Sequence, residues 1–428
     1  MSRPPLLLRA YGSLANIAAP LLFRRIRDRL IAHGTLPART RERLGHATLA
    51  RPPGPLVWIH GASVGETLSA LPVITALRDR PDAPAILVTS GTATSAQILA
   101  QRLPAGCIHQ FAPLDGAAAL RRFNAHWRPD LLVLMESEIW PQMILTAPCP
   151  VVLLNARLST RALSRWQRLG ASAAYLLSHL ALITAQTATV ADGLRALGVA
   201  PDRIRTGGNL KAAAPPPTAE VDALQAVRTA LGDRPRWLAA STHAGEEDAI
   251  LATHASLLTD HPDLCLILAP RHPDRADRIA AQVARAGLTL TRRSAGEGPT
   301  AQVYLADTLN EMGLWYRSAP VTFVGGSLTP NGGHNPWEGA ALGCALLTGP
   351  HLANCAEDWR SLEEAEAAII KLTGDTLTAA LARLLVDPNE AAAMGRRARA
   401  LTETRTGDVA RIADELLALM TTGESDAA

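Results

Sequence analysis

The stretch 55–77, PLVWIHGASVGETLSALPVITAL, decides how the first half of the chain folds. A short apolar run, typical of a buried strand, ends in a turn that holds glycines, a serine and a glutamate, and a run with the apolar spacing of a helix follows. Glycine lets the backbone turn sharply and approach a ligand closely. Polar residues on such loops often serve binding or catalysis. The stretch therefore predicts a strand–turn–helix unit with a functional turn.

The same alternation recurs along the chain. Apolar runs rich in Val, Ile and Leu are separated by stretches with helical spacing, and they lie at 85–92, 107–113, 131–137, 151–158, 181–187 and 203–209, then at 236–241, 264–270, 288–294, 302–307, 321–327 and 345–350. Strands that alternate with helices predict parallel sheets covered on both faces. Three consecutive prolines at 215–217 interrupt the alternation, because proline cannot continue a helix.

We therefore expect an α/β protein with two doubly wound, Rossmann-like domains facing a cleft. The length of 428 residues allows two separate cores. The predicted parts are an N-terminal segment (1–45), a first domain (46–212), a linker (213–220), a second domain (221–400) and a C-terminal helix (401–420) that crosses back to the first domain. In such sheets, ligands bind beyond the carboxyl ends of the strands.

Composition excludes several classes of function. The net charge is +3 and aromatic residues make up 4% of the chain, which argues against a nucleic-acid partner. The five cysteines are odd in number and widely spaced, so they indicate neither a disulfide framework nor a zinc site. We expect a reducing compartment.

The N-terminal segment is basic and apolar. Nine arginines accompany only Asp28 and Glu42 in residues 1–45, and they flank the apolar stretch 4–23. A spanning helix needs roughly 20 predominantly apolar residues, whereas this stretch includes Arg9, Asn16 and Pro20. We therefore expect it to lie on or anchor to an anionic membrane surface rather than insert cleanly. The alternative is a docked helix with solvated arginines.

The turn of the opening stretch fits three roles. Residues 61–65, GASVG, match the G-x-S-x-G elbow of serine hydrolases, in which Ser63 would be the nucleophile. That elbow follows a central strand preceded by several others, whereas only the basic N-terminal helices precede this strand. Glu66 could instead simply cap the positive end of the helix. We favour the third role, in which Glu66 is a general base in the cleft and Ser63 and Gly65 support it.

A second glycine-rich segment, GGSLTPNGGHNPWEGAAL (325–342), predicts a phosphate site. Gly332 and Gly333 would let the backbone approach a ligand, with His334 beside them. Asn335 suits the N-cap of a helix and Pro336 its first position, and the free N–H groups of such a helix start bind phosphate. Glu338, in the first turn, would accept hydrogen bonds from ribose. An ordinary glycine-rich loop remains the alternative.

Two further strand ends in the second domain carry polar residues. Arg271 follows the strand 264–270 and would reach a phosphate or a base, unless it is an ordinary surface arginine. Ser241 and Thr242 end the strand 236–241 and precede a helix opened by Glu246 and Glu247. Capping explains much of that pattern, so Ser241 and Thr242 count only as supporting residues.

Charged residues also follow strands of the first domain. Glu136, Glu138 and Lys211 lie at strand ends, where a lysine could stabilise a leaving phosphate or form a structural ion pair. No metal-binding pattern such as HEXXH or D-x-D is placed at a strand end. We therefore expect no metal, so that a nucleotide leaving group would depend on the helix start and on basic side chains.

Taken in order, these motifs resemble those of the 3-deoxy-D-manno-octulosonic acid (Kdo) transferases of lipopolysaccharide and lipid A biosynthesis, glycosyltransferase family 30. The similarity runs from the basic N-terminus through HGASVGE, ESEIWPQ, LNARLS, GNLK, STHAGEE, PRHPDR, FVGGSL and GGHNPWE. Each motif alone is weak, but the ordered set is specific. The resemblance implies an inverting glycosyltransferase of the GT-B fold, with the acceptor domain at 46–212 and the donor domain at 221–400.

The resemblance also implies roles for individual residues. Glu66 matches the family's general base, and Glu136 and Lys211 match its transition-state stabilisers. The positions that match those binding the cytidine monophosphate (CMP) part of the donor are Pro270, Arg271, Leu309, Asn310, Glu311, Asn335, Pro336, Trp337 and Glu338. Two departures concern the linker, where NLKAAAPPP replaces a more usual aromatic and acid, and the donor pocket, where Trp337 replaces a common leucine.

The implied reaction moves Kdo from CMP-Kdo to the tetraacyl disaccharide lipid A precursor, lipid IVA, without a cofactor or metal. The implied location is the cytoplasmic face of the inner membrane, held peripherally or by the N-terminal segment. One rival is a nucleotide-sugar epimerase of the same architecture, which would have no use for the basic apolar N-terminus. Another is a non-catalytic membrane-surface scaffold, against which the intact Glu66, Lys211 and Arg271 argue.

Overall fold

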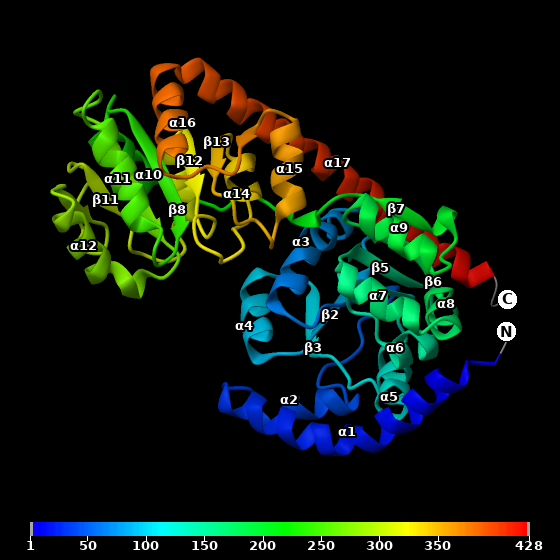
Figure 1. The fold of residues 1–428 in the computed structure, drawn as a ribbon. Helices are drawn as coiled ribbons and strands as arrows, with labels where there is room; N and C mark the ends of the chain where they lie inside the picture. Colours follow the sequence, from blue (N-terminus) through cyan, green and yellow to red (C-terminus); the bar gives the residue numbers. More distant parts are fainter. Residues whose placement is uncertain (1–2, 426–428) are drawn as a thin grey trace. The chain divides into compact units, whose positions relative to one another are not determined.

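A computed structural model describes residues 3–425 of the protein. The chain divides into two compact units (Figure 1). Unit 1 combines the chain up to Lys211 with the chain from Arg405 onward, and unit 2 runs from Ala212 to Thr404. Within the described residues, each unit contains a seven-stranded parallel sheet. The α/β class with two doubly wound domains is therefore confirmed.

The sheet of unit 1 places the opening stretch at its centre. Its strand order is β3-β2-β1-β4-β5-β6-β7, so β1 lies between β2 and β4, and Trp58 of β1 is in register with Leu87 and Leu132. The strand order reverses at β1, and ligands bind at such switch points. The strands are β1 (Leu56–His60), β2 (Ala85–Ser90), β3 (Cys107–Phe111), β4 (Leu131–Met135), β5 (Val151–Ala156), β6 (Leu180–Ala185) and β7 (Ile204–Thr206).

Helices cover both faces of this sheet (Figure 1). Trp58, Phe123 and Trp127 are fully buried, and the ring centroids of Trp58 and Phe123 lie 4.3 Å apart, which fixes α5 against β1. The helices are α1 (Leu6–Ala32), α2 (Pro37–Thr40), η1 (Arg41–Leu44), α3 (Val64–Arg78), α4 (Ala93–Arg102), α5 (Ala117–Trp127), α6 (Pro141–Thr146), α7 (Thr160–Arg168), α8 (Ala171–Leu177), α9 (Ala188–Ala196), η2 (Pro201–Arg203) and η3 (Leu210–Ala213).

The N-terminal segment forms the 27-residue helix α1, which includes Pro20. Among the described residues, α1 is the one helix long and apolar enough to cross a membrane, by length and composition. One side of it docks on unit 1, because the Tyr11 hydroxyl donates to Asp115 at 2.8 Å and Gly12 lies against Gln142. Asp115 also accepts the N–H groups of Gln142 and Met143 in α6. The opposite side of α1 is exposed.

Unit 2 repeats the same plan. Its strand order is β10-β11-β9-β8-β12-β13-β14, with the reversal at β8. Trp237, Tyr304 and Trp315 are buried in its core. The strands are β8 (Arg236–Thr242), β9 (Cys265–Pro270), β10 (Leu290–Arg292), β11 (Val303–Leu305), β12 (Val321–Val324), β13 (Ala345–Thr348) and β14 (Ala368–Ile369), of which the two-residue β14 was not predicted.

The end of the predicted linker packs on unit 2 before the first helix of that unit begins. The Pro217 carbonyl accepts a hydrogen bond from Arg317 in α13, and Gly313 leaves room for this segment, so residues 214–220 pack on unit 2. The helices are α10 (Val221–Leu231), α11 (Glu247–Leu257), η4 (Pro273–Arg275), α12 (Ala276–Arg285), α13 (Met312–Ser318), α14 (Trp337–Ala341), α15 (Ala356–Glu364), α16 (Gly374–Val386) and α17 (Pro388–Ser425).

Helix α17 contributes to both units. Met394 and Ala398 are buried in its first half, which belongs to unit 2. From Arg405 onward it belongs to unit 1, where Asp414 pairs with Arg80 at 2.7 Å. The helix predicted at 401–420 is thus the second half of a longer one.

Candidate active site

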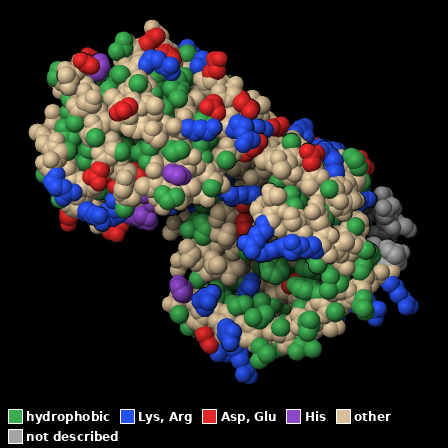
Figure 2. All heavy atoms as spheres, in the orientation of Figure 1, with side chains coloured by type: hydrophobic (Ala, Val, Ile, Leu, Met, Phe, Trp, Pro, Cys, Tyr) green, Lys and Arg blue, Asp and Glu red, His purple; other side chains and the backbone are tan. Residues whose placement is uncertain are grey.

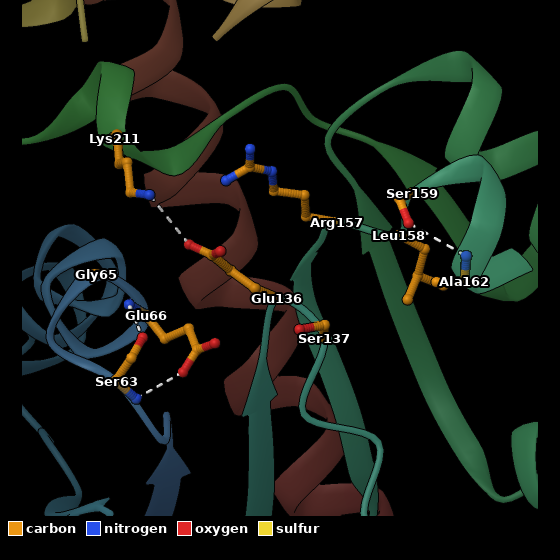
Figure 3. Close-up of a pocket in the computed structure, with 10 residues that line it drawn as sticks. All are labelled: Ser63, Gly65, Glu66, Glu136, Ser137, Arg157, Leu158, Ser159, Ala162 and Lys211. Atoms are coloured by element: carbon orange, nitrogen blue, oxygen red, sulfur yellow. Dashed lines mark hydrogen bonds and ion pairs between the residues drawn. The ribbon is translucent and has the colours of Figure 1, made fainter. Parts of the chain in front are cut away.

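A pocket of about 490 Å³ opens at the carboxyl ends of β1, β4 and β5 in unit 1 (Figure 3). The switch point of the sheet therefore coincides with a cavity. The pocket combines two carboxylates, a guanidinium and an ammonium within one small volume. Its lining residues are Ser63, Gly65, Glu66, Glu136, Ser137, Arg157, Leu158, Ser159, Ala162 and Lys211.

Glu66 caps a helix and lines the pocket at the same time. The Ser63 N–H donates to Oε2 of Glu66 at 2.7 Å, and the Glu66 N–H donates to the Ser63 hydroxyl at 3.4 Å, which together form a capping box at the start of α3. Figure 3 shows the other carboxylate oxygen directed into the pocket. The capping role weighed from the sequence is therefore real, and it leaves one oxygen of Glu66 facing the cavity.

Glu136 and Lys211 meet across the pocket. The Lys211 Nζ lies 3.3 Å from Oε1 of Glu136 (Figure 3). Glu136 adopts a φ of 52°, which is uncommon for a residue other than glycine. Its N–H donates to Leu154 and its carbonyl accepts from Arg157, so neighbouring β5 enforces the strained turn. This strain at the end of β4 orients the carboxylate towards the lysine.

Arg157 is a pocket residue that the sequence reasoning did not single out. It follows β5 directly, as the polar end of the run 151–158. Figure 3 shows its guanidinium directed to the same space as the Lys211 ammonium. Its position after a strand was the signal that could have identified it, as it did for Glu136.

Glu138, grouped with Glu136 from the sequence, points elsewhere. Its Oε2 lies 3.4 Å from Nε2 of His60 and accepts the Trp140 indole N–H at 2.6 Å. Burial raises the pKa of Glu138, but the contacts with His60 and Trp140 outweigh it and hold the pKa below its usual value. Glu138 therefore stays ionised and ties β1 to the loop before α6, outside the pocket.

In unit 2, the glycine-rich loop after β12 binds a protein carboxylate. Glu246, which is fully buried, accepts the N–H groups of Gly326 at 2.7 Å, Ser327 at 2.8 Å and Leu328 at 2.8 Å. The His243 N–H donates to the same carboxylate at 2.8 Å. These amides would otherwise form an anion-binding nest. From the sequence, Glu246 was predicted only to open a helix, and its place among these amides was not predicted.

The helix predicted at the second glycine pair begins one residue later and is short. Helix α14 starts at Trp337 and has five residues, with Pro336 at the N-cap instead of the first helical position. The Asn335 side chain accepts the Trp337 N–H at 3.2 Å, so it caps the turn but also occupies that donor. This is the bond that the predicted Asn335 cap makes to the second residue after it, and the binding of phosphate at this helix start stays a prediction.

Comparisons with known proteins identify the family. A family model described as 3-Deoxy-D-manno-octulosonic-acid transferase (kdotransferase) matches residues 38–214. The chain is 36% identical to the 3-deoxy-D-manno-octulosonic acid transferase of Bordetella pertussis over 86% of this chain and 89% of that protein. It is 32% identical to the enzyme of the same name from Haemophilus influenzae, over 95% and 97% of the two chains. The chain belongs to the Kdo transferase family.

As a Kdo transferase, the chain is a glycosyltransferase, and the resemblance inferred from its motifs is confirmed. Two solved structures share its fold at low identity. A glycosyltransferase from Rickettsia africae is 12% identical with a TM-score of 0.58, over 85% of this chain and 98% of that one. A UDP-GlcNAc 2-epimerase from Neisseria meningitidis is 15% identical with a TM-score of 0.57, over 85% and 99%. Both support the GT-B architecture.

The resemblance to Kdo transferases assigned a set of positions to the binding of the CMP part of the donor. These positions lie at the carboxyl edge of the unit 2 sheet. Pro270 ends β9 and is buried, whereas the Arg271 side chain that follows is exposed. Leu309 is also exposed, and Asn310 adopts a φ of 63°. The Glu311 carboxylate pairs with Arg293 at 2.6 Å, which, together with Thr308, lowers its pKa. Both segments thus follow the carboxyl ends of neighbouring strands, β9 and β11.

The remaining supporting residues of this Kdo transferase have structural partners. Thr242 is buried and donates to Glu247, which binds Arg275 through both oxygens. Ser241 adopts a φ of 55° at the end of β8.

Backbone hydrogen bonds also fix the loop from β12 to α14. The Gly333 N–H donates to the Gly326 carbonyl at 2.7 Å, and the Gly332 carbonyl accepts from Asn354 at 2.8 Å. Trp337 is buried in the core of unit 2, while Glu338 is exposed. Within residues 3–425, no group of three His, Cys, Asp or Glu side chains is arranged to hold a metal.

Proposed function

We propose that this Kdo transferase moves Kdo from CMP-Kdo to lipid IVA, by inversion and without a metal. The observation that carries the proposal is the pocket after β1, in which a carboxylate oxygen of Glu66 faces the Glu136–Lys211 pair. A general base beside a fixed positive charge suits attack by a sugar hydroxyl on an anomeric carbon.

In the proposed mechanism, the acceptor hydroxyl oxygen forms a bond to the anomeric carbon of Kdo. Glu66 takes the hydroxyl proton as the bond to the CMP phosphate oxygen breaks, and CMP leaves with the electron pair. Attack from the side opposite to the leaving group inverts the anomeric centre. Lys211, held by Glu136, stabilises the negative charge that develops during transfer.

The acceptor is a lipid, and α1 supports its delivery from a membrane surface. Leu14, Ile17 and Leu21 are 65%, 72% and 67% exposed, and they lie on one face at helical spacing. Arg24 and Arg25 continue this face. Figure 2 shows hydrophobic side chains gathered along the edge of unit 1 where Figure 1 draws α1, with basic side chains beside them. We propose a location on the cytoplasmic face of the inner membrane.

The test is mass spectrometry of lipid IVA after incubation with CMP-Kdo and the variant Glu66→Gln. Glutamine keeps an oxygen that can accept the Ser63 N–H, so the capping box survives while the base is lost. We expect Glu66→Gln to lose at least about 10³-fold in turnover while CMP still binds, because a general base contributes roughly that much.

Ser63→Ala is the matched control, because it removes the hydroxyl of the capping box and leaves the Glu66 carboxylate. It should cost about 1 kcal/mol of stability and retain most of the turnover. Near-normal turnover by Glu66→Gln would reject the general-base role. Absence of any Kdo-modified lipid with the unaltered protein would reject the proposed acceptor.

A further inference from the structure

Two histidines meet at the carboxyl edge of the unit 2 sheet. His243 follows β8 and His334 lies in the loop before α14, and their Nε2 atoms are 2.8 Å apart. The ring planes are inclined by 17° and the ring centroids lie 5.0 Å apart. Two imidazole rings stacked face to face would hold their Nε2 atoms further apart than 2.8 Å. The rings of His243 and His334 therefore meet edge to edge, in nearly one plane. This geometry is an N–H···N hydrogen bond in which one proton is shared between two imidazoles.

The surrounding loops hold the pair rigidly. Gly326 has a φ of 71°, and a Cβ at that position would lie 2.9 Å from Cδ2 of His334 and 3.6 Å from Cδ2 of His243. The His334 carbonyl accepts from the Cys355 thiol at 3.1 Å and from the Trp359 indole at 3.1 Å. The backbone of His334 is therefore fixed, and the absence of a side chain at Gly326 leaves room for the two rings.

The charges around the pair favour its neutral form while no anion is bound. Arg271, His272 and Arg275 face it from the segment after β9, and they oppose the effect of the Glu246 carboxylate. Burial, His243 and Arg271 lower the pKa of His334 to about 4, and burial lowers the pKa of His243 as well. Arg275 pairs with Glu247, whereas the Glu246 carboxylate, which accepts four backbone N–H groups, keeps its negative charge and offsets Arg271. A phosphate bound here would therefore make this edge negative unless the imidazoles gain charge.

Five amides of this loop already have acceptors within the protein. Those of Gly326, Ser327 and Leu328 donate to Glu246, that of Gly333 to a backbone carbonyl, and that of Trp337 to Asn335. The groups at this edge that can gain positive charge are the imidazoles, next to the exposed guanidinium of Arg271. A phosphate bound here can therefore draw on these side chains in addition to backbone amides.

We propose that the His243–His334 pair takes up one proton when the phosphate of a cytidine nucleotide binds beside Arg271, and that the charged pair recognises this phosphate. The ring that donates the shared Nε2–H has its lone pair on Nδ1, and the proton from solvent is added there. The N–H···N bond is kept, and the positive charge spreads over both rings. The proposal rests on the proposed donor, because it assigns the nucleotide to unit 2.

The experiment is calorimetry of CMP binding at pH 7 in buffers of different ionisation enthalpy, which counts the protons taken up. CMP itself titrates near pH 6, so the reference is the double variant His243→Asn/His334→Asn. We expect the unaltered protein to take up close to one proton more than this variant. Its CMP affinity should also strengthen more steeply as the pH falls from 8 to 6, by up to about tenfold per pH unit.

His261→Asn is the matched control, because His261 precedes β9 at the opposite edge of the same sheet. It should behave like the unaltered protein. Equal proton uptake by the unaltered protein and the double variant would overturn the proposal. If CMP fails to bind even the unaltered protein, the donor assignment fails instead.

Ring ¹⁵N resonances of the unaltered protein answer the question independently if the double variant does not fold. With CMP added at pH 7, the ring shifts of two histidines should move together part of the way from neutral to charged values, because the two rings share one added proton. No change in any ring on saturation with CMP would also overturn the proposal.

Discussion

Lys211 is one of only two lysines among the 42 lysine and arginine residues of the chain, and the other is Lys371. A chain that uses arginine almost everywhere keeps a lysine opposite Glu136. The ammonium is a compact point charge on a flexible stem, whereas a guanidinium is a planar fork that would also compete with nearby Arg157 for the same space. We therefore infer that position 211 requires a compact positive charge, which lysine provides and arginine does not.

At the residue scale we predict that Lys211→Met lowers the turnover by about 10²–10³-fold, because it removes one stabilising charge from the transition state. Lys211→Arg should not restore it. Stability should also fall, because Glu136 is 7% exposed and would be left as a buried carboxylate without its ion pair. Turnover and CMP affinity are measured separately, with the exposed Lys371→Met as the control. Loss of CMP affinity in Lys211→Met, or recovery in Lys211→Arg, would contradict this role.

A second residue-scale prediction concerns His254, which is fully buried in unit 2. Its Nδ1 accepts the Trp237 indole N–H at 3.3 Å and its Nε2 donates to the Gln302 carbonyl at 3.0 Å, so the neutral ring fits both partners. Burial lowers its pKa to about 4. Between pH 6.5 and 4 the unfolded chain therefore binds the extra proton, and stability falls as the pH falls.

Because only the unfolded chain is protonated at His254 in this range, we expect the free energy of unfolding to fall by about 2 kcal/mol from pH 7 to pH 5. Urea denaturation at the two pH values, followed by tryptophan fluorescence, measures it. The variant His254→Gln should flatten the pH dependence by a similar amount. An unchanged slope in that variant would show that His254 does not titrate on unfolding.

At the scale of elements, the sequence predicted the alternation well. The runs rich in Val, Ile and Leu correspond to strands because the interior strands are buried on both faces, as β1 and β4 are. The two-residue β14 was missed because so short a pairing leaves no periodic pattern. Helix α14 begins one residue later than predicted, although the Asn335 side chain accepts the Trp337 N–H as expected of the predicted cap.

The site was predicted less completely than the fold, for a physical reason. Glu66, Glu136 and Lys211 stood out because strand ends converge at one edge of a parallel sheet. Which way a side chain turns after leaving a strand depends on tertiary partners. His60 and Trp140 draw Glu138 away from the pocket, and the amides around Gly326 draw in Glu246. Of these partners, only Trp140 is close in sequence to the carboxylate that it contacts.

The element-scale prediction concerns α1. The double variant Ile17→Gln/Leu21→Gln should weaken binding to vesicles of mixed neutral and anionic phospholipid by at least about tenfold, because two exposed apolar side chains would no longer enter the interface. Vesicle co-sedimentation at low salt measures it. The control is Val221→Gln, which alters an 80% exposed apolar residue of α10. Equal binding by all three proteins would remove α1 from the membrane contact.

At the scale of the whole molecule, α17 links the stabilities of the two units. Met394 is 3% exposed and belongs to unit 2, whereas Leu416 is fully buried and belongs to unit 1. In unit 1, Ile412 of α17 lies against Gly207 and the Arg405 guanidinium donates to the Gly207 carbonyl. The end of the chain thus completes the core of the unit with which the chain begins.

We therefore predict that two substitutions on this one helix destabilise different units. Leu416→Ala should lower the unfolding free energy of unit 1 by about 2–5 kcal/mol, and Met394→Ala should do the same for unit 2, because each leaves a cavity in one core. Hydrogen exchange read by mass spectrometry separates the two effects. Faster exchange is expected around β7 for Leu416→Ala and around α16 for Met394→Ala. Val386→Ala, at a 73% exposed position, should change stability by less than about 0.5 kcal/mol. If both core variants speed exchange equally in both units, the helix joins them into one cooperative structure, and the division at Arg405 has no energetic meaning.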